Sequence, residues 1–199
     1  MRPSTRTTIK YLTLLFLLLG SGLTLYGLWL PIKAQVAQLL LERAWSISRN
    51  TGKPQKAWPW ADSWPVARLS IPSLDLDAII LKEAGGEGLA FGPVLLDQSA
   101  PLDQKGTTVI AAHRDTHFKA LADLHNGAFI KIEPFDGAAK TFQVDKMRVA
   151  RWDESGLIKE SDEQELVLSS CWPFDSIKPG PLRFIAEARK TEQAAALLP

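Results

Sequence analysis

The side chains best suited to chemistry in this chain are its single cysteine, Cys171, and the arginine that follows twelve residues later, Arg183. Cys171 ends a short apolar run, and Arg183 lies at the start of the next alternating run, after a Pro-Gly-Pro loop. Two neighbouring β-strands would therefore bring the thiol and the guanidinium together. A fixed cation beside a thiol stabilises the thiolate, which is the nucleophilic form. The alternative is a buried cysteine that acts only as a small hydrophobic side chain.

A histidine far upstream completes a candidate catalytic set. His113 ends an apolar run that begins at Thr107, so we expect its ring to point at the cleft that the strand ends surround. The set predicts acyl transfer in which Cys171 attacks a carbonyl, His113 protonates the departing amine and Arg183 holds the oxyanion or the substrate backbone. Most isolated histidines are structural, and no carboxylate clearly orients this one. Asp115 lies two residues away but is equally suited to forming a turn.

The composition gives little support to other chemistries. The formal net charge is +1 and the basic residues form no stripe, so nothing indicates a nucleic-acid partner. His113 and His117 share one short window, but the preceding segment is strand-like and no cysteine or third histidine is close enough in sequence to complete a zinc site. We therefore expect no metal ligands. A solvated loop explains the acids before the cysteine run better than a calcium site does: Asp153, Glu154, Glu160, Asp162, Glu163 and Glu165.

The N-terminal part is typical of a membrane anchor. The 22 residues from Tyr11 to Ile32 carry no charged side chain, and at about 1.5 Å per residue they span a hydrocarbon core of roughly 30 Å. A cleaved signal peptide and a buried helix are the alternatives, and the cleavage motif is poor. Lys and Arg are balanced on the two sides, three before the span and three after it. The acid-free first ten residues favour an N-terminus inside the cell and a catalytic part outside.

The rest of the chain predicts a mainly β fold. Beyond Pro65 the hydrophobic period shortens toward two, and eight short runs separated by turn residues suit a closed, antiparallel-rich barrel. We expect helices at 33–49 and 118–126, a frayed helical tail at 190–199, and structural packing of the Trp/Pro-rich segment 58–64. The eight runs are 66–72, 74–81, 92–97, 107–113, 128–133, 140–151, 166–170 and 182–189.

Two segments carry a resemblance to a known family. Residues 110–130, IAAHRDTHFKALADLHNGAFI, resemble the histidine motif of the sortases, and residues 166–188, LVLSSCWPFDSIKPGPLRFIAEA, resemble their cysteine-to-arginine motif. The combination of HRDTHF and CWPF is most similar to the class GN sortases of Gram-negative bacteria. The similarity extends from about Trp64 to Arg189. Ala112 stands where glycine is common, and Ser170 stands where threonine is common.

The resemblance implies an eight-stranded sortase-type barrel and a transpeptidation. Cys171 would cleave an LPxTG-like sorting signal of a secreted protein after its threonine, and an amine acceptor in the cell envelope would resolve the thioacyl intermediate. His113, Cys171 and Arg183 match the catalytic positions one for one. No cofactor is indicated; calcium activates some sortases, but nothing in this sequence supports it. The residues expected to contact substrate are Ala112, Ser170, Trp172 and Leu182.

The predicted organisation is a cytoplasmic tail (1–10), a transmembrane signal-anchor (11–32), a helix and Trp/Pro-rich linker (33–63), a catalytic domain (64–190) and a C-terminal tail (191–199). The catalytic domain is expected on the periplasmic side of the inner membrane. Two other functions stay open: a cysteine peptidase that releases its substrate to water, and a non-catalytic anchored module that holds a partner through segment 58–64.

Overall fold

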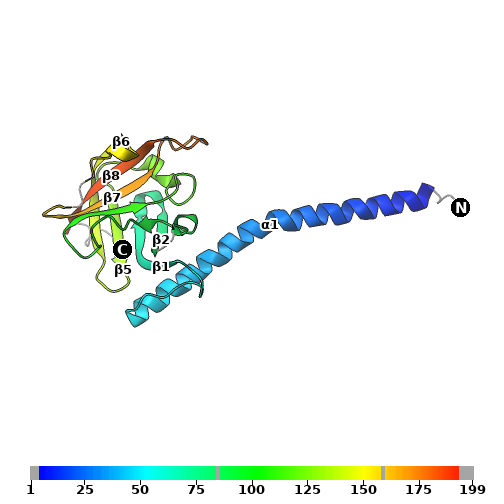
Figure 1. Ribbon diagram of the computed structural model, residues 1–199, viewed down its shortest axis with the longest axis horizontal. Helices are drawn as coiled ribbons and strands as arrows, with labels where there is room; N and C mark the ends of the chain where they lie inside the picture. The colour runs from blue at the N-terminus through cyan, green and yellow to red at the C-terminus, as the bar shows by residue number, and fades with distance from the viewer. Residues whose placement is uncertain (1–4, 84–85, 158–159, 193–199) are drawn as a thin grey trace. The chain divides into compact units, whose positions relative to one another are not determined.

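The computed structural model describes residues 5–83, 86–157 and 160–192. The chain divides into two compact units, residues 1–39 and residues 40–199. The described part of the first unit, residues 5–39, is helix, and the second unit contains a closed β-barrel together with the last turns of the same helix (Figure 1).

The N-terminal helix α1 runs without interruption from Thr5 to Thr51. It includes the segment 33–49 that the sequence predicts as a separate helix. Pro31 does not end the helix, since proline removes one backbone hydrogen bond and the strong helix formers on both sides outweigh that loss. By length and composition α1 is the one helix among the described residues that is apolar enough to cross a membrane.

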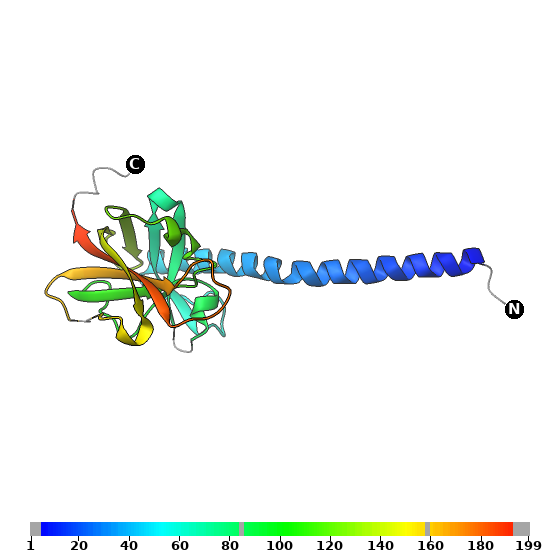
Figure 2. The same ribbon diagram turned by 90° about the horizontal axis from the view of Figure 1, so that it is seen from above.

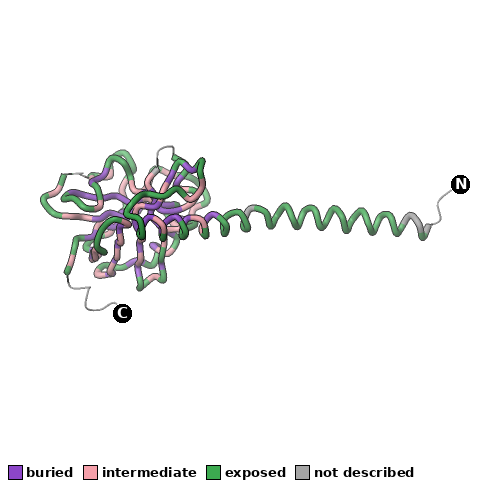
Figure 3. The backbone as a smooth tube through the Cα atoms, turned by 90° about the horizontal axis from the view of Figure 1, so that it is seen from below, coloured by how far each residue is buried: buried purple, intermediate pink, exposed green. Residues whose placement is uncertain are grey.

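The apolar part of α1 suits an apolar solvent. Every side chain described between Ile9 and Trp29 is exposed, as the green tube in Figure 3 shows. The hydroxyls of Thr13 and Thr24 donate to helix carbonyls one turn earlier, at 3.0 and 2.8 Å. These two hydroxyls are therefore satisfied within the helix, as a hydrocarbon environment requires.

All eight predicted strands are present and close into a barrel in the order β1-β2-β3-β4-β7-β8-β6-β5. The pairs β2–β3 and β4–β7 are parallel, and the other neighbours are antiparallel. The strands are β1 (Ser63–Ile71), β2 (Leu76–Glu83), β3 (Val94–Leu95), β4 (Gly106–Ala111), β5 (Phe129–Pro134), β6 (Lys140–Arg151), β7 (Gln164–Cys171) and β8 (Leu182–Thr191).

The helical segments of the barrel unit are short. Four 3-10 helices lie between strands: η1 (Pro72–Leu74), η2 (Gly88–Ala90), η3 (Lys119–Asp123) and η4 (Trp152–Glu154). The helix predicted at 118–126 is η3, which is shorter than expected. The predicted helical tail is wrong at its start, because Lys190 and Thr191 extend β8 by pairing with β6. Residues 193–199 of that tail lie outside the described residues.

Strand alternation separates an inner face from an outer face in β4, β7 and β8. Ile110, Leu168 and Ala186 are buried and point into the main core. The neighbouring positions Val109, Val167 and Ile185 form a separate apolar cluster on the other face. Residues that lie an even number of positions from this second set on the same strand therefore also face the outside of the barrel. These residues include Cys171 on β7 and Arg183 on β8.

The last turns of α1 pack against the barrel within the second unit. Leu41 and Trp45 join a hydrophobic cluster with Ile79 and Leu81 of β2. Arg49 forms an ion pair of 2.6 Å with Glu133 at the end of β5. Its guanidinium also donates to the carbonyls of Pro134 and Gly137, at 3.1 Å each. Part of the predicted linker 33–63 thus contributes to the hydrophobic packing of the unit that holds the barrel.

Candidate active site

Cys171 and Arg183 lie directly opposite each other at the open end of the β7–β8 pair. The two strands run side by side in Figures 1 and 2, and residues 172–181 connect them. The backbone N–H of Trp172 donates to the carbonyl of Leu182 at 3.0 Å, so pairing continues one step beyond the cysteine. Cys171 is a free, half-buried thiol. The prediction that the strand end carrying Cys171 lies beside the strand start carrying Arg183 is confirmed.

The guanidinium of Arg183 is held by the connection that precedes it. Its Nη1 donates to the carbonyl of Gly180 at 2.8 Å and to that of Leu182 at 2.9 Å. Both hydrogen bonds that the described residues make with this side chain use Nη1, so Nε and Nη2 are available to another acceptor. The position of the cation therefore depends on the conformation of residues 172–181.

His113 leaves the same end of the sheet as Cys171, because β4 and β7 are parallel and their last paired residues are Ala111 and Ser169. Beyond that pair, the N–H of Ala112 donates to the Ser169 carbonyl at 3.2 Å. The same register continued by two residues sets His113 opposite Cys171. The histidine is exposed, and its carbonyl accepts a hydrogen bond of 3.0 Å from the Phe118 N–H, which closes the turn after β4.

The turn that follows His113 contains the second histidine of the HRDTHF segment. His117 is half-buried, and its pKa is lowered by burial and, to a lesser extent, by the charge of His113. The charge of the His113 ring thus affects the protonation of the His117 ring. Asp115 is exposed, and among the described residues it makes no hydrogen bond to His113. The structure therefore supplies no carboxylate from this turn to orient the catalytic candidate.

Two of the four predicted substrate-contact residues are buried. Ala112 and Ser170 are in step with the inner face of the barrel, at 6% and 2% exposure. The Ser170 hydroxyl donates to the Ala112 carbonyl at 2.9 Å. Any contact of these two residues with a substrate would therefore involve their backbone. Trp172 and Leu182 are half-buried, and the Trp172 ring packs on Phe174 and Phe184, with centroids 5.6 and 6.3 Å apart. Substrate contact stays a prediction for all four.

An apolar groove leads to the candidate site along the outer face of β4, β7 and β8. It has a volume of about 360 Å³, and its lining includes Ser169 and Arg183 but neither Cys171 nor His113. The sequence analysis did not single out its apolar lining, although these residues follow the alternation of the strands that carry the site. Leu157 and Ser155 contribute from the connection before β7. The apolar lining includes Leu96, Val109, Ala111, Trp152, Leu157 and Ile185.

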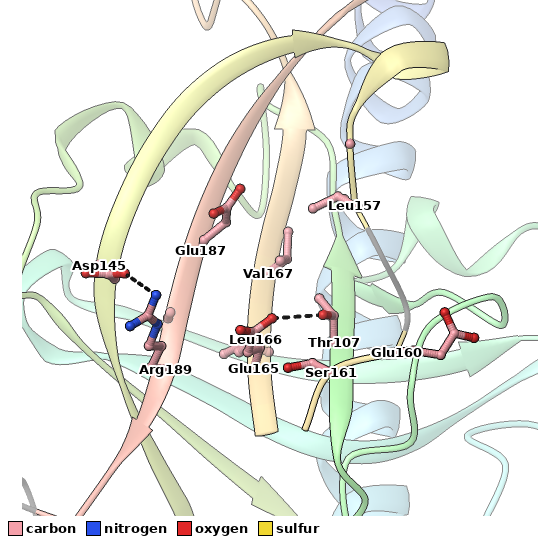
Figure 4. A pocket seen from close by; sticks show the side chains of 12 residues that line it. Thr107, Asp145, Leu157, Glu160, Ser161, Glu165, Leu166, Val167, Glu187 and Arg189 are labelled. Carbon is pink, nitrogen blue, oxygen red and sulfur yellow. Dashed lines mark hydrogen bonds and ion pairs between the residues drawn. The ribbon is translucent and has the colours of Figure 1, made fainter. Parts of the chain in front are cut away.

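A second cavity, of about 300 Å³, lies near the start of β7 and the end of β8, away from the thiol (Figure 4). In the described part of the chain, three of the four acidic side chains that line it have a partner, and one of these is Glu187, which pairs with Arg148 at 2.6 Å. The Glu165 carboxylate accepts a hydrogen bond of 3.0 Å from Thr107, and Asp145 pairs with Arg189 at 3.3 Å. Among the described residues no three His, Cys, Asp or Glu side chains come together as a metal site would require.

The chain combines a closed eight-stranded barrel with a cysteine and an arginine on adjacent strand ends. Comparison with known protein families shows which class of protein has this arrangement. The family model of the sortase domain matches residues 69–191, which is more than half of the chain. The chain therefore belongs to the sortase family, as the two sequence motifs predicted.

Individual relatives are distant. Sortase D of Bacillus subtilis (strain 168) is 25% identical over 123 residues, which cover 61% of this chain and 62% of that protein. Sortase A from Corynebacterium diphtheriae superposes with a TM-score of 0.60 at 22% identity, over 67% of this chain and 63% of that chain. A Clostridium perfringens sortase D5 transpeptidase has a TM-score of 0.64 at 17% identity, over 79% and 99%. The chain thus spans less than two thirds of the first two relatives, and the structural likenesses show the fold.

Proposed function

We propose that this chain is a membrane-anchored cysteine transpeptidase that cleaves an LPxTG-like C-terminal sorting signal and joins the released protein to an amine. The observation that carries the proposal is the pairing of Cys171 with Arg183, which lines an apolar groove, beside the strand that leads to His113. Membership of the sortase family supports the same reaction. The class GN assignment rests on the sequence motifs alone.

The proposed reaction has two acyl transfers. The Cys171 thiolate attacks the threonine carbonyl of the signal, and the C–N bond to the following residue breaks as the His113 imidazolium protonates the departing amine. An incoming amine then loses a proton to His113 and attacks the thioester, and the C–S bond breaks to restore the thiolate. Nε and Nη2 of Arg183, which the loop carbonyls leave available, are suited to the developing oxyanion or to a substrate carbonyl.

The groove supplies a place for the signal ahead of the scissile bond. Val109, Leu157 and Ile185 present an apolar surface beside the catalytic end. An extended peptide laid along it would bury an apolar side chain against them while its threonine carbonyl reached Cys171. The proposed partner is accordingly a secreted protein whose C-terminal signal contains such a side chain, and the acceptor is an amine of the cell envelope.

Helix α1 supports the proposed location. Its exposed apolar part, from Ile9 to Trp29, suits an uncleaved anchor in the inner membrane. The proposed orientation has the N-terminus in the cytoplasm and the barrel on the periplasmic side. This assignment rests on the absence of acids in the first ten residues.

The test uses the full chain in detergent micelles with a fluorescent peptide that contains an LPxTG-like signal. We expect amide product when a primary amine is added and a thioacyl adduct on Cys171 detectable by mass spectrometry. Cys171→Ala should abolish both, and His113→Ala should lower the transfer rate. Acid product alone would favour a peptidase. Unchanged joining by Cys171→Ala would contradict the proposed role of the thiol, and the absence of any product from the wild type would leave a non-catalytic module.

A further inference from the structure

Arg114, which directly follows His113, is a buried arginine with 9% exposure. Its Nη1 donates to the carbonyl of Pro173 at 3.0 Å, and its Nη2 donates to the carbonyl of Lys178 at 2.8 Å. Both carbonyls belong to the β7–β8 connection, residues 172–181. Among the described residues Arg114 takes part in no ion pair, so these backbone carbonyls are what its guanidinium binds.

We infer that Arg114 is a positioning residue: it fastens the turn of His113 to connection 172–181, whose two ends are Cys171 and Arg183. The inference rests on the proposed function, because it gives Arg114 a part in placing the three catalytic groups. Buried charged groups are rare unless they are paired or hydrogen-bonded, and here the hydrogen bonds go to the one segment that links the thiol to the cation.

Hydrogen bonds within the connection are few, although the rings of Trp172 and Phe174 pack on Phe184. Three of its ten residues are prolines, which lack a backbone N–H and so cannot donate to a turn. Ser176 makes its internal bonds: its N–H donates to Pro173 at 3.3 Å and its hydroxyl donates to Lys178 at 3.1 Å. Arg114 binds the same two carbonyls from outside, so Ser176 and the guanidinium together fix both ends of segment 173–178.

Each carbonyl that Arg114 binds belongs to a residue two positions from one that contributes to the proposed site. Pro173 lies two residues after Cys171. Lys178 lies two residues before Gly180, whose carbonyl holds Nη1 of Arg183 at 2.8 Å. Loss of the two Arg114 hydrogen bonds would free both Pro173 and Lys178, and with them both ends of the connection. The thiol would stay on β7, but the guanidinium of Arg183 and the ring of His113 would lose their common support.

The geometry requires an arginine. A planar guanidinium presents several N–H groups in a fixed fork and can bind two separate carbonyls at once. A lysine at the same place would keep the charge but deliver it from one nitrogen, so we expect it to hold one carbonyl well and not both. A glutamine would lose the charge and is shorter.

The test compares Arg114→Gln, Arg114→Lys and the wild type as full chains in detergent, with the sorting-signal peptide and a primary amine as substrates. We expect Arg114→Gln to lower kcat about 10²-fold with little change in the KM of the peptide, since small displacements of catalytic groups have effects of this size. Arg114→Lys should recover part of the loss. Arg148→Gln is the matched control, because it removes a half-buried arginine of β6 that bonds to Glu187 on β8, four residues beyond Arg183. It should lower the melting temperature and leave kcat unchanged.

The outcomes separate this inference from the proposed function. A wild-type kcat in Arg114→Gln would overturn the inference while the proposed function stood, provided that Cys171→Ala is inactive. Failure of the proposed function would instead appear in the wild type, as absent amide product. A higher KM with an unchanged kcat would make Arg114 a substrate contact and overturn the positioning role. If Arg114→Gln does not unfold cooperatively, the Arg114→Lys variant decides in the same way. Unfolding of both variants would show a role in folding alone and would also overturn the inference.

Discussion

The hydroxyl of Ser170 donates a hydrogen bond of 2.9 Å to the carbonyl of Ala112, inside the barrel and away from the groove. Ser170 directly precedes the cysteine and Ala112 directly precedes the histidine. The bond therefore joins the two strand ends that carry the thiol and the imidazole, at the point where regular β4–β7 pairing stops at Ala111 and Ser169. The two candidate catalytic residues face the outside while the bond that aligns them is buried.

Replacement of Ser170 by alanine tests this alignment. The substitution leaves a buried carbonyl without its donor, which costs about 1–3 kcal/mol. We expect Ser170→Ala to lower the free energy of unfolding and to lower kcat, because the His113 turn is no longer tied to β7. Ser170→Thr keeps a hydroxyl and should retain more of both. Denaturant unfolding and peptide transfer measure the two effects; an unchanged kcat in Ser170→Ala would argue against the alignment.

Filling the groove should weaken substrate binding without unfolding the barrel. Ala111 is half-buried and lines the groove beside the catalytic end. Ala111→Phe directs a large ring into space that the peptide would need, so we expect a KM raised about tenfold or more, in line with the loss of an apolar subsite. Val149→Phe, on the exposed surface of β6, is the control and should leave KM unchanged. A wild-type KM for Ala111→Phe would mean that the peptide lies elsewhere.

The docked end of α1 should contribute strongly to the stability of the barrel unit. Trp45 is 6% exposed and packs with Leu41 on Ile79 and Leu81. Its truncation to alanine leaves a large cavity, and such changes cost about 3–5 kcal/mol. We expect Trp45→Ala to lower the melting temperature clearly in thermal unfolding. Trp60→Ala is a matched control at a residue that is 80% exposed, and equal effects of the two substitutions would contradict the packing.

His117 should make the protein less stable in acid. Its pKa is lowered in the folded state by burial and by His113. The unfolded chain therefore binds a proton at a higher pH than the folded chain does. The stabilisation is complete above the unfolded pKa of about 6.5 and is lost as the pH falls through the folded value. His117 is half-buried, so screening by solvent keeps the effect modest.

The measurement compares wild type with His117→Gln by thermal unfolding at about pH 5 and at about pH 7.5. The variant has no imidazole to protonate, so its melting temperature should fall less than that of the wild type when the pH is lowered. An equal loss in both proteins would place the acid sensitivity elsewhere. Asp115→Asn, at an exposed position of the same turn, serves as the control.

The sequence predicted the strands well because each of them carries its own signal. Alternation and turn residues mark all eight, and the short connection between β7 and β8 made Cys171 and Arg183 neighbours by local reasoning alone. The continuous helix was missed since the predicted anchor ends just before the first charged residue after the apolar span, Lys33, whereas α1 continues through it. The tail was mistaken for helix because pairing with β6 decides the state of Lys190 and Thr191, and periodicity does not report pairing.

The sequence by itself determined the inventory: an apolar N-terminal helix, eight short strands, and a thiol, an imidazole and a guanidinium at strand ends, since these follow from residue types and short-range spacing. Only the tertiary structure decided that β4 lies parallel to β7, that alternation turns Val109 and Ile185 toward a groove, and that Arg114 reaches across to Pro173 and Lys178. These are contacts between residues more than fifty positions apart. Such contacts depend on how the sheet closes, which no local pattern specifies.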